Sequence, residues 1–92
     1  MKTLTLPERL DSGAAPVLYQ DLSQHLGQDV TLDAAALRHL GTLCTQVLLS
    51  AARTWRNAGA HFTCTSLGPE ASAQLSLLGV SPSQLTDQSY VN

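Results

Sequence analysis

Three short segments with the pattern of β-strands alternate with three longer segments with the pattern of α-helices, and this order limits the possible folds more than any other feature. We expect strands at residues 3–6, 28–33 and 61–65, and helices at residues 15–26, 42–58 and 69–78. A repeated strand–helix order is typical of α/β domains, in which strand–helix–strand units that pair in parallel cross over right-handedly. The sequence therefore predicts a single small α/β domain, with a mixed, mostly parallel sheet of about four strands and helices packed on it.

Glycine and proline stand at the ends of these segments. Gly27, Gly59 and Gly79 follow the three expected helices, and Pro69 falls in the opening turn of the third, where a proline is tolerated. The 92 residues suffice for one domain and are too few for two. We therefore expect one domain over residues 1–86, followed by a polar tail at residues 87–92.

Charge and hydropathy argue against two large classes of partner. The formal net charge is −2, and the five lysines and arginines form no basic run, so the chain lacks the electrostatic signature of a nucleic-acid-binding protein. No apolar stretch approaches the roughly 20 residues of a membrane-spanning helix, and the N-terminal segment lacks the apolar core of a signal peptide. These observations predict a cytoplasmic protein that neither binds nucleic acid nor inserts into a membrane.

The long helix expected at residues 42–58 has two contrasting faces when each residue is given about 100° of rotation. An apolar face is expected to pack on the sheet and comprises Cys44, Val47, Leu48, Ala51, Trp55 and Ala58. The opposite face is expected to meet solvent and comprises Thr42, Thr45, Leu49, Arg53 and Arg56, with Ala52 at its edge. Leu49 is unusual in polar company and has two interpretations: a docking patch for a partner, or a side chain that fills a groove beside a neighbouring helix.

Thr42 begins this helix and has two interpretations that can coexist. As an N-cap, its hydroxyl would accept a hydrogen bond from a free amide of the first turn. As a phosphosite or partner-contact residue, it would stand where the helix dipole favours a phosphate. Phosphorylation would then change the docking surface and leave the fold intact.

The residues that carry catalytic or metal chemistry in other proteins are poorly arranged for it here. His39 and Cys44 stand five residues apart, at diverging angles and with no orienting acid, so a thiol–imidazole nucleophile is disfavoured. His61 and Cys64 fall on opposite faces of a strand, with no second pair to complete a metal site. Asp33 is expected to cap the turn after its strand. We expect no enzymatic activity, no cofactor and no metal, and two buried reduced thiols.

Together these residues resemble a STAS domain, the fold of anti-sigma-factor antagonists, over about residues 3–85. The matching positions are Val30-Thr31-Leu32-Asp33, Leu37, Leu40, Thr42, Gln46-Val47-Leu48-Leu49, Trp55, Gly59, Leu75, Leu78 and Gly79. In that family the loop before the long helix reads roughly Asp-Ser/Thr-x-Gly, and a partner kinase phosphorylates its hydroxyl residue. Here Gly41 and Cys44 replace the Asp and the Gly of that motif, so only the hydroxyl of Thr42 is retained.

The pattern Leu-Gly-x-x-Cys-x-Gln-Val-Leu-Leu, with a downstream tryptophan, also resembles a divergent STAS branch found near chemotaxis genes in proteobacteria, whose members act as accessory interaction modules. The resemblance implies a non-enzymatic signalling module that binds a kinase or an anti-sigma factor and is modulated by phosphorylation at Thr42. Its expected partner-binding residues are His39, Gly41, Thr42, Thr45, Leu49 and Arg53. Members without the full motif also serve as subunits of lipid-transporting ABC systems, so an ABC ATPase is the alternative partner.

Overall fold

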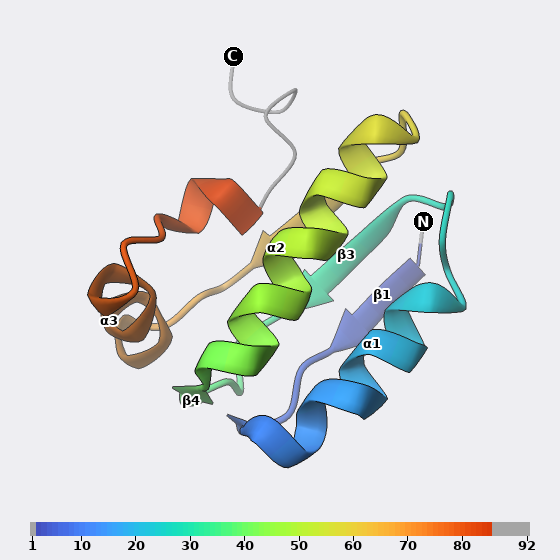
Figure 1. The fold of residues 1–92 in the computed structure, drawn as a ribbon. Coiled ribbons are helices and arrows are strands. Elements are labelled where there is room, and N and C mark those ends of the chain that lie inside the picture. The colour runs from blue at the N-terminus through green and yellow to red at the C-terminus, as the bar shows by residue number, and fades with distance from the viewer. Residues whose placement is uncertain (1, 86–92) are drawn as a thin grey trace.

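Five strands, three α-helices and two short 3₁₀ helices form the part of the chain that the computed structural model describes, residues 2–85 (Figure 1). In chain order they are β1 (Lys2–Thr5), β2 (Arg9–Leu10), η1 (Ser12–Ala14), α1 (Ala15–Ser23), β3 (Val30–Asp33), β4 (His39–Leu40), α2 (Thr42–Asn57), β5 (Phe62–Thr65), α3 (Pro69–Leu77) and η2 (Pro82–Leu85). The predicted α/β class is confirmed, and each expected strand and helix is present. The predicted tail at residues 87–92 lies outside the described residues.

The strands form a parallel sheet of three and a separate parallel pair, where the sequence predicted one mixed sheet of about four strands. The main sheet has the order β1-β3-β5, with Lys2 beside Val30 at its start. β2 and β4 pair separately, with Arg9 beside His39. β2 and β4 were not predicted, because a strand of two residues is too short to show any alternation.

A turn after Asp33 separates the two sheets. The Asp33 Oδ1 atom accepts a hydrogen bond from the Ala35 amide at 3.0 Å, which closes a side-chain-capped turn. The chain therefore leaves the ladder after β3, as the capping interpretation of Asp33 predicted. Pairing resumes further on, where the Glu8 carbonyl accepts a hydrogen bond from the His39 amide at 3.1 Å.

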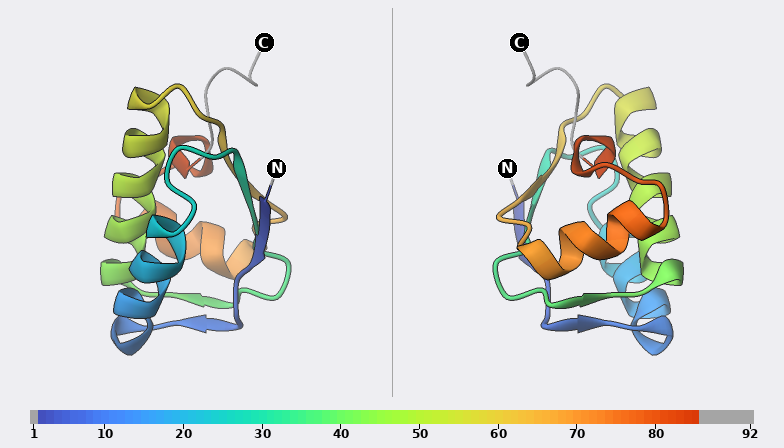
Figure 2. Two further views of the ribbon diagram at one scale, coloured as in Figure 1. Left: turned by 90° about the vertical axis from the view of Figure 1, so that its right-hand side faces the viewer. Right: turned by 90° about the vertical axis from the view of Figure 1, so that its left-hand side faces the viewer.

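Helices α1 and α2 cover one face of the main sheet (Figure 2). On the covered face Val30, Leu32 and Phe62 are buried. The opposite face carries two rows of short polar side chains across the three strands: Thr3, Thr31 and Thr63 in one row, and Thr5, Asp33 and Thr65 in the next. Because alternate residues of a strand point to opposite faces, the buried and polar sets separate cleanly into a two-layer fold.

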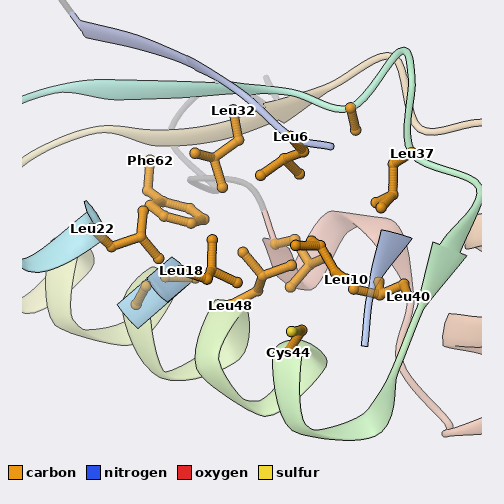
Figure 3. Packing of buried hydrophobic residues seen from close by; sticks show 14 of the residues in the cluster. Leu6, Leu10, Leu18, Leu22, Leu32, Leu37, Leu40, Cys44, Leu48 and Phe62 are labelled. Carbon is orange, nitrogen blue, oxygen red and sulfur yellow. The ribbon is translucent and has the colours of Figure 1, made fainter. Parts of the chain in front are cut away.

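The core fills the space between the main sheet and the two helices that cover it (Figure 3). Leu22 of α1 and Leu48 of α2 pack toward the sheet. Trp55 is 2% exposed, and its ring centroid lies 5.6 Å from that of Phe62. The indole Nε1–H donates a hydrogen bond to the Gln28 carbonyl at 2.6 Å, so the polar atom of this large side chain is satisfied inside the core.

Candidate functional site

The start of α2 is fixed by backbone contacts. Gly41 occupies the N-cap position with φ of −79° and ψ of 168°, and no side chain caps the helix. The Gly41 amide donates to the Leu10 carbonyl at 2.8 Å, and the Gly41 carbonyl accepts from the Thr45 amide at 3.0 Å. Thr42 is the first helical residue, so the prediction that its hydroxyl caps α2 is wrong.

The packing at Gly41 and Cys44 suits the two residues that depart from the motif of the family this chain resembles. A Cβ atom on Gly41 would lie 3.1 Å from the carbonyl oxygen of Leu10 and 3.6 Å from the Cα atom of Asp11. The first distance is shorter than ordinary van der Waals contact, so β2 leaves little room for an aspartate side chain at this position. Cys44, which stands where the motif has glycine, is 0% exposed in the core. A residue without a side chain therefore fits at position 41, and the cysteine at position 44 fills space in the core.

Four residues lie together where β4 passes into α2. Thr42 is exposed, and the neighbouring Leu43 is 55% exposed. His39 is half-buried in β4, and Gly41 joins the strand to the helix. We call His39, Gly41, Thr42 and Leu43 the helix-start surface. Leu43 was not among the predicted site residues. The sequence signal for it is only that Leu43 is an apolar residue in the first turn of the helix and lies outside the expected apolar face.

Helix α3 holds the backbone that leads into the helix-start surface. The Gln74 Oε1 atom accepts a hydrogen bond from the Leu40 amide at 2.6 Å, and Gln74 Nε2 donates to the Arg38 carbonyl at 3.4 Å. The Gln74 amide thus bonds to β4 as a neighbouring strand would. Arg38 also forms an ion pair with Glu70 of α3 at 3.1 Å, but both side chains are well exposed, so this pair contributes little stability.

The buried face of α2 is rotated relative to the predicted one. Thr45 and Ala52 are buried, Val47 is half-buried and Ala58 is exposed. At about 100° per residue, the buried arc is turned by roughly 50° from the expected one. The expectation that Thr45 faces solvent is therefore wrong: it is 0% exposed, and its hydroxyl donates to the Gly41 carbonyl at 2.9 Å.

The two remaining predicted site residues lie apart from the helix-start surface. Leu49 is half-buried against the core, and Arg53 is exposed. Both line an open groove of about 270 Å³ on α2, and we call its lining the arginine groove: Leu49, Ala52, Arg53, Arg56 and Gln84. Because an α-helix rises 1.5 Å per residue, Arg53 lies roughly 16 Å along α2 from Thr42. Partner docking at Leu49 stays a prediction.

A protein-family model described as "Mlab, STAS domain" matches residues 2–86, which is nearly the whole chain. The chain belongs to the STAS domain family. STAS domains generally serve as protein-interaction or regulatory modules and are usually not catalytic. No curated protein and no solved structure matches the chain.

The thiol nearest the helix-start surface of this STAS domain is held in an unreactive state. The Cys44 Sγ atom donates to the Asp11 carbonyl at 3.2 Å. Burial, and then the negative charge of Asp11, raise the pKa of the Cys44 thiol above its ordinary value, so the thiol stays protonated and is not an activated nucleophile. Within residues 2–85, no group of three or more His, Cys, Asp or Glu side chains is placed to hold a metal ion, and no helix has the length and apolar character needed to cross a membrane.

Cys64 of the STAS domain should react slowly with thiol reagents. Burial, and then the negative charge of Asp33, raise the pKa of Cys64 from 9.0 to about 11. Below the ordinary pKa this lowers the thiolate fraction by about 100-fold. In a Cys44→Ser variant, alkylation by iodoacetamide should be slower by about that factor than in a cysteine peptide, and its rate should keep rising toward pH 11. Mass spectrometry follows the alkylation rate. A rate that stops rising near the ordinary pKa of a thiol would contradict the raised pKa of Cys64.

Proposed function

We propose that this STAS domain is a non-enzymatic, cytoplasmic module that binds a partner protein through the helix-start surface. The observation that carries the proposal is the exposure of Leu43, at 55%, beside the exposed Thr42. A single exposed leucine is common on protein surfaces. This one stands on a junction that β2 and α3 hold in place through hydrogen bonds to Gly41, Leu40 and Arg38. A pre-organised apolar group binds well because little conformational entropy is lost on association.

We further propose that the domain acts in a bacterial signalling pathway, with a kinase or an anti-sigma factor as the partner. Phosphorylation of Thr42 would modulate the binding of this partner. The exposed first position of α2 is accessible to a kinase, and a phosphate there would lie at the positive end of the helix dipole. The added charge would stand beside Leu43 and change partner binding while the fold persists. Accessory roles in chemotaxis belong to this class of pathway.

Phosphate mapping by mass spectrometry, on protein recovered from cells, tests the phosphorylation step. We expect a phosphate on Thr42 under at least one growth condition. If Thr42 carries none under any condition, binding through this surface is constitutive and the switch is refuted.

A second candidate function is that of a regulatory subunit in a lipid-transporting ABC system. Its support is the replacement of the family motif by Gly41 and Cys44, together with the packing that fits these two residues, because STAS domains without the full motif serve in such systems. The identity of the co-purified partner separates the two candidates: a kinase or an anti-sigma factor supports the first, and an ABC ATPase supports the second.

The Leu43→Arg variant tests the binding surface. Affinity purification from the native cells should recover at least about 30-fold less partner with this variant, since central apolar contacts of an interface are worth about 2 kcal/mol or more. Leu77→Arg is the matched control, because Leu77 at the end of α3 is 87% exposed and lies outside the proposed surface. Both variants should keep the wild-type melting temperature. Full recovery of the partner by Leu43→Arg would overturn the proposed surface.

A further inference from the structure

The arginine groove combines an apolar floor with a positively charged rim. Leu49 and Ala52 form the floor, where Ala52 is 5% exposed and Leu49 is half-buried. Arg53 and Arg56 are exposed, and Gln84 lines the groove from η2, which lies alongside α2 (Figure 1). Residues three and four apart share a helix face, so both guanidinium groups stand over the same strip of α2.

The charge on this strip is of one sign. The 16 residues of α2 include two arginines and no aspartate or glutamate, and none of the described residues that line the groove is acidic. By contrast, Arg38 in another part of the described chain has an acidic partner, because it forms an ion pair with Glu70.

Helix stability accounts for only part of this arrangement. Arg56 lies in the last turn of α2, where a cation interacts favourably with the negative end of the helix dipole. Arg53 lies almost one turn earlier, where this effect has largely fallen off. Leu49 and Ala52 pack against the core, and the half-buried Leu49 leaves apolar surface beside Arg53 that a partner side chain can contact.

We propose that the arginine groove takes an acidic segment of the partner protein, with an apolar side chain on the floor and carboxylates on the two arginines. Guanidinium groups bind carboxylates through paired N–H donors, which gives both charge complementarity and direction. This inference rests on the proposed function, because it assumes that the STAS domain binds a protein. It adds a second contact on the same helix, roughly 16 Å from Thr42, so that one partner spans both places.

Site-specific photo-crosslinking in the full chain tests this inference. A benzophenone amino acid replaces Gln84 in one variant and Leu43 in another, each is expressed in the native cells, and the cross-linked peptides are sequenced by mass spectrometry. The Gln84 probe should capture a segment rich in aspartate and glutamate that also contains a large apolar residue. Arg53→Glu should lower the yield of this cross-link at least about tenfold, whereas the matched reversal Lys2→Glu on β1 should leave it within about twofold.

The two probes separate the failure of this inference from the failure of the proposed function. Cross-linking by the Leu43 probe alone would overturn the acidic-segment inference and leave the helix-start surface standing. Capture of a segment without acidic residues, or of residues 86–92 of the chain itself, by the Gln84 probe would also overturn it. The absence of any cross-link from either probe would overturn both proposals.

Discussion

Replacing Trp55 by alanine should lower the free energy of unfolding by about 3–5 kcal/mol, the usual cost of deleting a large aromatic side chain from a core. Trp55 is 2% exposed, packs on Phe62, and joins α2 to the loop before β3 through its hydrogen bond to the Gln28 carbonyl. Removal of the indole creates a cavity and leaves that carbonyl without its partner. Chemical denaturation followed by far-UV circular dichroism measures the change, since tryptophan fluorescence is lost with the residue.

The Trp55→Phe variant is the matched control for the hydrogen bond. It keeps an aromatic ring against Phe62 but removes the Nε1–H donor, so a loss of about 1–2 kcal/mol is expected. A loss below about 1 kcal/mol for Trp55→Ala would show that this residue is not central to the core. Equal losses for the two variants would assign the whole effect to the hydrogen bond.

Placing glutamate at Thr45 should cost about 4 kcal/mol or more, whereas glutamate at Thr42 should change stability by no more than about 1 kcal/mol. Thr45 is 0% exposed, so a carboxylate at this position would be buried. The only cationic side chains of α2 are Arg53 and Arg56, which lie two or more turns further along the helix. Thr42 is exposed at the first position of α2, where the helix dipole favours a negative charge. Because small domains are stable by only about 5–15 kcal/mol, the Thr45 variant should lose a large part of its stability and unfold at a much lower temperature.

The Thr45→Ser variant controls for the position itself. Serine keeps a hydroxyl that can donate to the Gly41 carbonyl and loses one methyl group, so a loss near 1 kcal/mol is expected. Thermal unfolding of the three variants under one set of conditions checks the order. Thr45→Glu and Thr42→Glu proteins of equal stability would contradict the burial of Thr45.

The long elements of the fold were predictable because each carries a complete physical pattern. β3 was expected to end at Asp33 and does so, and α2 was expected at 42–58 and spans Thr42–Asn57. β2 and β4 were not predictable, since they are defined only by their pairing with each other across about 30 residues of sequence. The split into two sheets depends on this pairing and on the turn that Asp33 caps.

The faces of α2 were predicted incorrectly in part, because a polar residue was assumed to face solvent. Thr45 counts as polar, but in a helix its hydroxyl can bond to the carbonyl four residues back, which lets the side chain be buried without an unsatisfied group. The covering of the Ala52 side by η2 depends on tertiary contacts that helical periodicity does not contain. Both effects move the buried arc in the same direction.

The candidate site was predictable only in part for the same reason. Thr42 and Arg53 are exposed as expected, because short polar and charged residues on an amphipathic helix generally face solvent. The close approach of Leu10 to Gly41 and the bonds from Gln74 to β4 arise between segments more than 30 residues apart. No local pattern encodes such contacts.

The small β2–β4 pair is separate from the main sheet, so its residues and those of the main sheet contribute unequally to the core. Most of the buried leucine, phenylalanine and tryptophan side chains are on other elements. The β2–β4 pair adds Leu10 and Leu40 to the core, while its other two residues, Arg9 and His39, are exposed and half-buried. Substitutions of the exposed Arg9 side chain should therefore cost little stability, whereas substitutions of the buried Leu10 or Leu40 should destabilise the core.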